Sequence, residues 1–380
     1  MTIQRKKIAI ILGTRPEAIK LAPVIKRFSE DDRFEVVVLI TAQHRDMLDQ
    51  VLQFFDIVPH YDLNIMTENQ SISDVTTTCL KGVGAILEKE RPDMAIVQGD
   101  TTTVFAAALA CFYQRIPVGH VEAGLRTSDK FSPFPEEINR RMASVLADIH
   151  FAPTSWAREN LLREGVPSGQ VFITGNTVVD ALLDVSSRPI ECTENIQRLP
   201  EFLSLVDRFI LVTAHRRESF GEPFSDMCRA MADIVAVNPG VGIIYPVHPN
   251  PNVRKTAREF LCNNPRVLLL DPLDYITFVH LMKQSYLVLT DSGGVQEEAP
   301  SLCKPVLIMR EKTERQEGVN AGVTRLVGTK RDGIVSAVNL LLQSEEEYKS
   351  MATGCNPFGD GAASKKIVDL VADHLMLRDT

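Results

Sequence analysis

Short apolar runs alternate with amphipathic stretches along most of the chain. Runs of aliphatic residues, many of them β-branched, predict buried strands. They lie at residues 8–12, 35–40, 94–98, 116–121, 150–153, 209–213, 242–247, 266–270, 286–290 and 305–309. Apolar residues at helical spacing predict helices between them, for example over 17–28, 72–87 and after residue 135, whereas 61–70 reads as a polar loop. Such alternation predicts α/β domains with parallel, doubly wound sheets.

The strand-and-helix plan occurs twice, once in each half of the chain. A chain of 380 residues is too long for one ordinary core, so two domains are expected. Between the halves, residues 185–208 are polar and contain two prolines, which is typical of a connection or an edge helix. We place the boundary at Gly175, which gives one Rossmann-like domain over 1–174 and another over 175–361.

Polar residues repeatedly follow the strand runs directly. They are Arg15, Gln43, His44, Asp100, Glu122, His215, Arg216, His248 and the segment Ser292 to Gly294. In open α/β sheets ligands bind outside the carboxyl ends of the strands. We therefore expect these residues to surround one ligand site in a cleft between the two domains.

The run at 286–290 leads into Asp291-Ser292-Gly293-Gly294 and then into helical composition. This order predicts that Ser292, Gly293 and Gly294 begin a helix with unpaired N–H groups, which is an anion site. Glu298, about one turn later, could accept a hydrogen bond from a hydroxyl such as that of a ribose. The alternative is a tight turn capped by Asp or Ser with no ligand, and a Gly-Gly turn alone does not decide between them.

A set of cations accompanies this helix start, namely Arg15, Lys20, His215, Arg216 and Arg315. A helix terminus contributes only about 0.3–1 kcal/mol to anion binding, or ~2 kcal/mol when partly buried. Several charge-assisted hydrogen bonds of roughly 1.5–3 kcal/mol each would be needed to hold a diphosphate. For each arginine the alternative is a solvated or salt-bridged surface charge.

The acidic set comprises Asp100, Glu122 and Glu136. Asp100 could instead cap the helix after it, and a carboxylate in a first helical turn, as at Glu136, is favourable in any case. Glu122, between a strand and Ala-Gly, needs a partner. Carboxylates near one cleft raise one another's pKa values, which suits proton transfer at neutral pH.

Composition excludes several classes of partner and cofactor. A net charge of −8 argues against nucleic acid and anionic membranes as partners. Seven scattered cysteines without a Cys-x-x-Cys motif indicate reduced thiols in a cytoplasmic protein, and the first apolar run is too short for a signal sequence or a membrane span. No metal-ligand spacing, Walker loop or Gly-x-Gly-x-x-Gly motif occurs, so neither a metal nor a cofactor is predicted.

A combination of motifs over nearly the whole chain resembles the bacterial non-hydrolysing UDP-N-acetylglucosamine 2-epimerases. The motifs are Gly13-Thr-Arg-Pro-Glu-Ala-Ile-Lys20, Thr41-Ala-Gln-His-Arg45, Gly99-Asp-Thr-Thr-Thr103, His120-Val-Glu-Ala-Gly-Leu-Arg126, Pro135-Glu-Glu137, Gly175-Asn-Thr177, His215-Arg-Arg-Glu-Ser219, Asp291-Ser-Gly-Gly-Val-Gln-Glu-Glu298 and Asn356-Pro-Phe-Gly-Asp-Gly361. The resemblance implies a glycosyltransferase-B type fold with two Rossmann-like domains facing across a cleft. It also implies that the last helix, in 362–380, crosses back to the first domain.

The implied reaction interconverts UDP-GlcNAc and UDP-ManNAc, without a cofactor, to supply bacterial surface polysaccharide. No carbonyl acidifies the hydrogen at C2, so the family eliminates UDP to form a glycal and then adds it back. A cytoplasmic homodimer is expected.

The resemblance also implies residue roles. Asp100, Glu122 and Glu136 would handle protons and stabilise the cationic transition state, while His215 assists the departing β-phosphate beside Arg15 and Lys20. The remaining substrate-binding residues would be Ser292, Gly293 and Gly294 at the phosphates, Phe278 at the uracil, Glu298 at the ribose, and Arg315.

A second UDP-GlcNAc would act as an activator in members of this family. The matching positions here are Gln43, Gln70, Glu137, Arg216 and His248, although Asn69 stands where strongly regulated members would carry Arg. Alternative functions are a hydrolysing epimerase that releases free ManNAc, a glycosyltransferase of the same architecture, and a non-catalytic nucleotide-sugar sensor.

Overall fold

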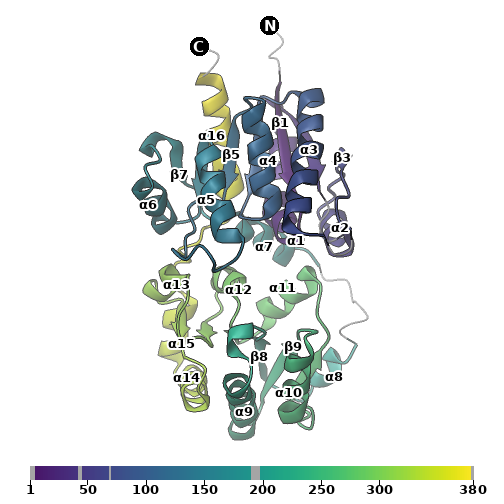
Figure 1. Ribbon diagram of the computed structural model, residues 1–380. Helices are drawn as coiled ribbons and strands as arrows, with labels where there is room; N and C mark the ends of the chain where they lie inside the picture. Colours follow the sequence, from purple (N-terminus) through teal and green to yellow (C-terminus); the bar gives the residue numbers. More distant parts are fainter. Residues whose placement is uncertain (1–4, 42–44, 68–69, 190–196, 378–380) are drawn as a thin grey trace. The chain divides into compact units, whose positions relative to one another are not determined.

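Each predicted strand run forms a strand, with bounds that shift by a residue or two. The computed structural model describes residues 5–41, 45–67, 70–189 and 197–377. The described chain separates into two compact units, Met1–Ala181 with Phe358–Thr380, and Leu182–Pro357. Both are built on parallel sheets flanked by helices (Figure 1), so the predicted fold class is confirmed.

The division between the units passes through one helix, α7 (Thr177–Ser187), beyond the boundary placed at Gly175. The start of α7 is tied to the first unit because the buried Asp180 carboxylate accepts hydrogen bonds from Ser364 N at 2.8 Å and Ser364 Oγ at 2.6 Å. The returning C-terminal segment begins at Phe358, whose carbonyl accepts a hydrogen bond from Asn176 N at 2.6 Å.

The first unit contains a sheet in the order β3-β2-β1-β4-β5-β6-β7, in which every neighbouring pair is parallel. Its strands are β1 (Lys6–Leu12), β2 (Phe34–Ile40), β3 (Tyr61–Asp62), β4 (Met94–Gln98), β5 (Val118–Val121), β6 (Ile149–Ala152) and β7 (Val171–Ile173). Its helices are α1 (Arg15–Ser29), α2 (Arg45–Phe54), α3 (Ile72–Glu90), α4 (Thr102–Tyr113), α5 (Glu136–Leu146), α6 (Ser155–Arg163), the start of α7, and α16 (Ala363–Leu377), with a 3₁₀ turn η1 (Ser168–Gln170).

Alternating side chains along β1 enter different layers of this unit. Ala9 and Ile11 join a buried cluster with residues of α3 and α4, including Cys79, Val83 and Val104. The intervening side chains face the opposite side of the sheet, where α1 packs against α16. Both faces of the sheet are therefore covered, and its strands read as continuous apolar runs.

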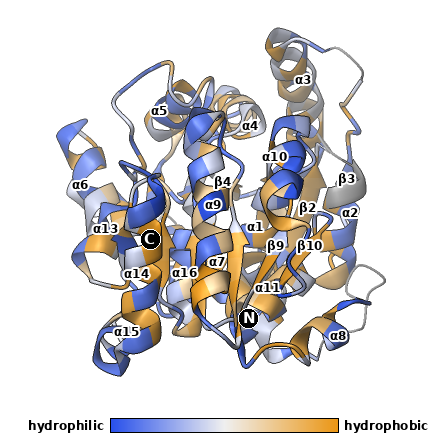
Figure 2. Ribbon diagram, turned by 90° about the horizontal axis from the view of Figure 1, so that it is seen from below, coloured by the Kyte–Doolittle hydropathy of each residue, from blue (hydrophilic) through white to orange (hydrophobic). Residues whose placement is uncertain are grey.

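The second unit contains a parallel sheet in the order β10-β9-β8-β11-β12-β13. Its strands are β8 (Arg208–Thr213), β9 (Val241–Pro246), β10 (Val267–Leu270), β11 (Leu287–Thr290), β12 (Val306–Ile308) and β13 (Thr324–Leu326). Its helices are α8 (Leu199–Leu203), α9 (Glu222–Val237), α10 (Pro251–Leu261), α11 (Tyr275–Gln284), α12 (Gly293–Glu298), α13 (Gln316–Asn320), α14 (Arg331–Gln343) and α15 (Glu345–Ala352), with 3₁₀ turns η3 (Arg217–Ser219) and η4 (Ala299–Leu302). Figure 2 shows the apolar strands β9 and β10 beside helices with hydrophilic outer sides.

Three short strands were not predicted. β3, β7 and β13 span only two or three residues each, too few to show a periodic pattern, and β3 lies within the stretch 61–70 that was predicted to be a loop. None of the helices that the structure describes is long and apolar enough to cross a bilayer.

The chain reverses its winding direction at one place in each sheet. β1 lies between β2 and β4, and β8 lies between β9 and β11. At such switch points the turns after the two central strands diverge and leave room for a ligand. The turns after β1 and β4, and those after β8 and β11, are therefore the places where candidate site residues gather.

Two buried histidines predict acid sensitivity of the first unit. His120 and His150 are paired neighbours on β5 and β6, and burial lowers the pKa of His120 to about 4 and that of His150 to about 3. Both are neutral in the folded protein but gain protons below about pH 6.5 when unfolded. The free energy of unfolding should therefore fall as pH drops below this value, by roughly 2 kcal/mol per histidine at pH 5.

Urea unfolding at pH 7.5 and pH 5.0 measures this effect. His150→Leu should reduce the difference between the two pH values, because it removes one of the two buried groups that gain a proton on unfolding. An unchanged difference in His150→Leu would contradict the assignment.

Candidate functional site

The turn after β1 is held by hydrogen bonds among its own residues and the first turn of α1. Thr14 is the N-cap of α1, and Glu17 completes a capping box by accepting hydrogen bonds from Gly13 N and, at 3.1 Å, Thr14 N. Gly13 is required here because an added Cβ would lie 2.4 Å from the hydroxyls of Thr41 and Thr103. This close packing places Arg15 at the first position of α1, beside the switch point.

Glu122 lies at the end of β5 in a left-handed backbone conformation, with φ of 63°. Its buried carboxylate contacts Lys20 Nζ at 2.6 and 2.7 Å, accepts a hydrogen bond from Asn176 Nδ2 at 3.0 Å, and accepts another from Gln98 Nε2. Lys20 is the partner that the sequence required for Glu122. The donors converge on the carboxylate from α1, from β4 and from the residue before α7, which offsets the backbone strain.

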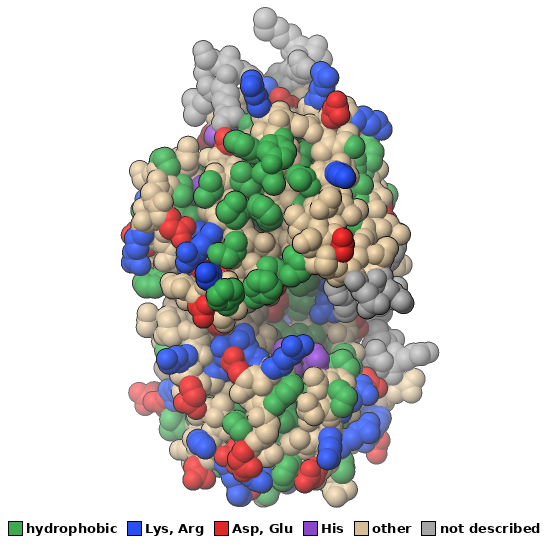
Figure 3. Space-filling view, in the orientation of Figure 1, with side chains coloured by type: hydrophobic (Ala, Val, Ile, Leu, Met, Phe, Trp, Pro, Cys, Tyr) green, Lys and Arg blue, Asp and Glu red, His purple; other side chains and the backbone are tan. Residues whose placement is uncertain are grey.

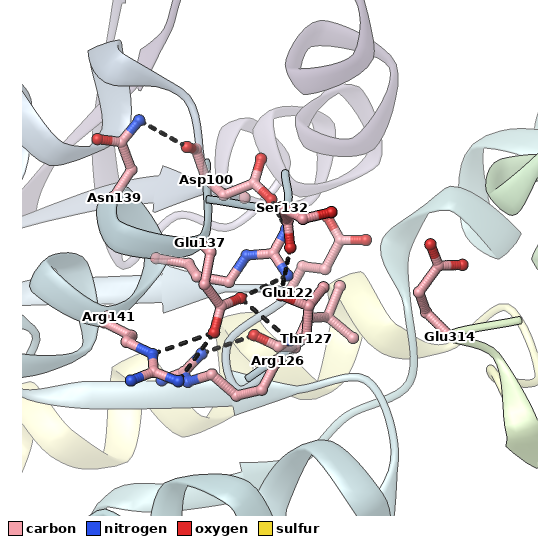
Figure 4. Close-up of polar contacts among 12 residues, drawn as sticks. Asp100, Glu122, Arg126, Thr127, Ser132, Glu137, Asn139, Arg141 and Glu314 are labelled. Atoms are coloured by element: carbon pink, nitrogen blue, oxygen red, sulfur yellow. Dashed lines mark hydrogen bonds and ion pairs between the residues drawn. The ribbon is translucent and has the colours of Figure 1, made fainter. Parts of the chain in front are cut away.

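Asp100 follows β4 and is held from α5 (Figure 4). Its carboxylate pairs with Arg140, and its carbonyl accepts a hydrogen bond from Asn139 Nδ2 at 3.1 Å. The N-cap of α4 is Thr101, whose hydroxyl accepts a hydrogen bond from Val104 N at 3.3 Å. The alternative reading of Asp100 as a helix cap is therefore wrong.

Glu136 opens α5 and is partly exposed. Asn139 and Arg140, which reach Asp100, lie three and four residues later, so Glu136 shares their side of the helix. Within the described part of the chain, its carboxylate makes no hydrogen bond or ion pair.

Of the residues expected at a regulatory site, Glu137 is fully buried. Its carboxylate accepts hydrogen bonds from Arg141 Nε at 3.0 Å and Thr127 N at 3.1 Å, which fixes the loop before α5 (Figure 4). Gln70 bonds within its own loop, donating to Ile65 O at 2.7 Å. Gln43 lies outside the described residues.

In the second unit, Asp291 holds the turn that carries His215 and Arg216. Its side chain is fully buried, and Oδ2 accepts hydrogen bonds from His215 N at 2.7 Å and Arg216 N at 2.8 Å. The other oxygen, Oδ1, lies 3.5 Å from His215 Nδ1. The imidazole of His215 remains 41% exposed and stacks on His248, with 5.3 Å between ring centroids. The pKa of His248 is lowered mainly by its partial burial and, to a smaller extent, by the neighbouring His215.

Helix α12 begins at Gly293 with Ser292 as its N-cap, as predicted. The expectation that the Ser292 N–H is unpaired is wrong, because it donates to Thr290 Oγ1 at 2.9 Å. The guanidinium carbon of Arg315 lies 3.2 Å from the place that a Cβ on Gly293 would occupy. A cation and a helix start therefore adjoin one another here.

The remaining predicted binding residues lie on α11, at the end of α12 and just before α13. Arg315 Nε donates to Glu297 Oε1 at 2.7 Å, and the largely buried Glu298 accepts a hydrogen bond from Tyr275 OH at 2.8 Å. Phe278 lies on α11, one turn after Tyr275, and packs against a buried apolar cluster.

The predicted residues thus form one group in each unit. The first unit gathers Arg15, Lys20, Asp100, Glu122 and Glu136 at the ends of β1, β4 and β5, and the second gathers His215, Arg216, His248, Ser292, Gly293, Gly294 and Arg315 near the ends of β8, β9 and β11. Among the described residues, no three or more His, Cys, Asp and Glu side chains gather as a metal site. The metal-free site stays a prediction.

Sequence reasoning missed several residues that hold these groups, namely Glu17, Gln98, Arg140, Asn176 and Asp291. Gln98 was detectable as a polar residue at the end of an apolar strand run, and Glu17, Asn176 and Asp291 lie in quoted motifs. Arg140 carries no comparable signal, because an arginine on an amphipathic helix usually faces solvent.

Comparison with known proteins places the chain in a family. A family model described as UDP-N-acetylglucosamine 2-epimerase matches residues 26–372. A UDP-N-acetylglucosamine 2-epimerase of Escherichia coli K12 is 51% identical over 371 residues, covering 97% of this chain and 99% of the relative.

Solved structures give the same result. The UDP-GlcNAc 2-epimerase of Neisseria meningitidis, bound to UDP-GlcNAc, has a TM-score of 0.87 and 47% identity, covering 97% of this chain and 100% of that one. The enzyme of Methanocaldococcus jannaschii, in complex with UDP-GlcNAc and UDP, has a TM-score of 0.77 and 35% identity, covering 96% and 99%. Matches of this extent show that the chain belongs to the UDP-N-acetylglucosamine 2-epimerase family, a family of isomerases.

Proposed function

We propose that this protein interconverts UDP-GlcNAc and UDP-ManNAc by inverting C2 through elimination of UDP and its re-addition. Family membership supports UDP-GlcNAc as the substrate. The observation that carries the mechanism is the placement of Asp100 and Glu122 at the ends of adjacent strands, each beside a cation, with Glu136 on the side of α5 from which Asn139 and Arg140 reach Asp100. This arrangement offers both fixed negative charge and a carboxylate able to exchange a proton.

In the first half-reaction the C1–O bond breaks and its electron pair leaves with the β-phosphate of UDP. A carboxylate removes the proton from C2, and the C2–H electrons form the C1=C2 double bond of a glycal. UDP then adds back to C1 while a proton is delivered to the other face of C2. Positive charge develops at C1 during both steps, and the ion-paired carboxylates of Asp100 and Glu122 would stabilise it. Glu136 is suited to exchange the proton.

The second unit supplies the groups that would hold UDP. His215 is oriented by Asp291 and would stabilise the departing β-phosphate, assisted by Arg315 and by the N–H groups of Gly293 and Gly294. Phe278 would contact the uracil, and Glu298 would bind the ribose. In the first unit, Arg15 and Lys20 would contribute further charge to the diphosphate.

A second UDP-GlcNAc would act as an activator, contacting Gln43, Gln70, Arg216 and His248, whereas the buried Glu137 would act only by holding the loop before α5. The stacking of His248 on His215 supports this proposal, since a ligand beside His248 would touch the ring that assists UDP. The M. jannaschii relative is described in complex with both UDP-GlcNAc and UDP.

The product would supply surface polysaccharide synthesis in the bacterial cytoplasm, where reduced cysteines such as the buried Cys79 and Cys111 persist.

The protein would act as a homodimer, and α5 offers an apolar surface for a second copy. Its buried residues include Glu137 and Asn139, while Ile138, Met142 and Val145 are exposed at helical spacing. We call these three residues the α5 stripe. Figure 3 shows hydrophobic side chains gathered on this face of the first unit. Such a patch, with few charges, can pair with its own copy about a two-fold axis without opposing like charges.

Incubation of the protein with UDP-GlcNAc in D₂O tests the reaction. UDP-ManNAc should form and carry deuterium at C2, because the proton that leaves one face exchanges with solvent before another returns. UDP should stay attached in most turnovers. Oxygen-18 placed in the bridging position should scramble into the non-bridging oxygens of the β-phosphate, since the C1–O bond breaks.

The alternatives give different products by NMR. A hydrolysing epimerase would accumulate free ManNAc and UDP, and a glycosyltransferase would need an acceptor and leave C2 protonated. Inversion with neither deuterium at C2 nor scrambling of oxygen-18 would refute the glycal mechanism.

Substitutions separate chemistry from binding. Asp100→Asn and Glu136→Gln should lower kcat by about 10²-fold or more with a smaller effect on KM, because these groups act in the transition state. Phe278→Ala should chiefly raise KM by weakening contact with UDP. If all three variants changed only KM, the assigned roles would be wrong. Steady-state kinetics of UDP-ManNAc formation provide both constants.

A charge on the α5 stripe should separate the dimer. Val145 and Val58 are both 81% exposed, but only Val145 belongs to the stripe, so Val145→Asp has a matched control in Val58→Asp. Light scattering should give a dimer for the wild type and Val58→Asp, and a monomer for Val145→Asp. A dimer that survives Val145→Asp would place the interface elsewhere.

A further inference from the structure

One buried carboxylate, that of Glu17, joins the two turns at the switch point of the first sheet. On one side it accepts the N–H groups of Gly13 and Thr14, in the turn that carries Arg15. On the other side its Oε1 accepts a hydrogen bond from Thr101 Oγ1 at 2.5 Å. Thr101 directly follows Asp100 in the turn after β4. The carboxylate therefore links the backbone beside Arg15 to the backbone beside Asp100.

This arrangement exceeds what a helix cap requires. The capping box of α3 has the same design, in which the exposed Asp74 carboxylate, among the residues that the structure describes, bonds only to Ser71, at 3.0 Å to its N and 2.6 Å to its Oγ. Glu17 is only 2% exposed and takes a third donor from another element. Burying a carboxylate is unfavourable, and an exposed residue would complete the same cap without that cost. The additional bond to Thr101 is the feature to be explained.

We propose that Glu17 is a positioning residue for the epimerisation, which fixes Arg15 and Asp100 relative to one another by accepting hydrogen bonds from both of their turns. The inference rests on the proposed function, in which Arg15 binds the diphosphate and Asp100 acts at the sugar. Glu17 itself acts through these two residues. Its distinctive link is the hydroxyl of Thr101, which also caps α4 by accepting from Val104 N.

The ionised form of Glu17 suits this role because all three partners are donors. A proton on either oxygen of the Glu17 carboxylate would point at one of these donors and weaken its hydrogen bond. Burial raises the pKa of Glu17 to about 7, although the bonds from Thr101, Gly13 and Thr14 act in the opposite direction. Two other titratable groups face it, Asp100 after β4, whose charge raises this pKa further, and Cys79 of α3. Burial and then the charge of Glu17 raise the pKa of Cys79 to about 12, so this group stays a neutral thiol. The link should accordingly weaken as pH falls through about 7.

Glu17→Gln tests the proposal, with Asp74→Asn as the matched change in a capping box whose bonds reach neither the turn of Arg15 nor that of Asp100. The amide keeps the shape of the side chain but presents an N–H to one of the three donors. We expect kcat to fall by about 10- to 100-fold with a smaller change in KM. Asp74→Asn should keep kcat within about twofold of the wild type. In addition, the loss of kcat on acidification through about pH 7 should be weaker in Glu17→Gln than in the wild type.

A double-variant cycle separates positioning from general destabilisation. If Glu17 acts through Asp100, Glu17→Gln should lower kcat less in an Asp100→Asn background than in the wild type. Equal factors in the two backgrounds would overturn the proposal. If Glu17→Gln does not fold, the pair Thr101→Ser and Thr101→Val decides. Serine keeps the donor and should retain activity, valine should lose it, and equal activity of the two would overturn the proposal.

The two proposals fail in distinguishable ways. A wild-type protein that forms no UDP-ManNAc would refute the proposed function and this inference with it. A wild-type protein that forms UDP-ManNAc, with Glu17→Gln as active as Asp74→Asn, would refute the role of Glu17 alone.

Discussion

Surrounding each buried carboxylate with cations or hydrogen-bond donors is the constraint on which both candidate groups depend. Moving such a charge out of water costs several kcal/mol unless cations or hydrogen-bond donors surround it. Glu122 is surrounded by Lys20 and two amide side chains, and Asp291 by two backbone N–H groups. Each carboxylate follows a strand with neighbours on both sides, β5 for Glu122 and β11 for Asp291. The parallel arrangement brings neighbouring turns within reach of one side chain, and the donors on these turns offset the cost of burying the carboxylate.

The donors that satisfy these charges also fix the shape of the turns. Asp291 accepts from the two consecutive N–H groups of His215 and Arg216, so the backbone after β8 cannot turn away without exposing a buried charge. Glu122 adopts a left-handed φ that costs a non-glycine residue of order 1–3 kcal/mol, and its four contacts with Lys20, Asn176 and Gln98 hold it there. Candidate reactive groups therefore stand on turns whose conformation is determined before any ligand binds. Such preorganisation is what electrostatic catalysis requires.

Hydrophobic periodicity was sufficient to predict the strands, their parallel order of connection and the position of polar residues at strand ends. It could not reveal the edge strands β3, β7 and β13, because two or three residues show no period. Most site residues next to strand ends were found, although Gln98 and Asp291 were not. Arg140 and Glu17 were missed because the partners that reveal their roles, Asp100 and Thr101, are distant in the chain. Periodicity also does not report local side-chain acceptors, so it could not show that the hydroxyl of Thr290, two residues earlier, accepts the Ser292 N–H.

The orientation of α5 follows from the same constraint and shows how the site limits the surface. Asn139 and Arg140 must face the turn of Asp100, and Glu137 must be buried to hold the loop before the helix. These polar residues occupy the inner side of α5, which in an ordinary amphipathic helix would be apolar. Ile138, Met142 and Val145 are consequently left on the outer side, where exposure to water is unfavourable. A helix whose inner side supports charged groups gains little stability from burying apolar side chains within its own unit. A second molecule covering its outer side would restore that gain and would stabilise the helix that carries Glu136.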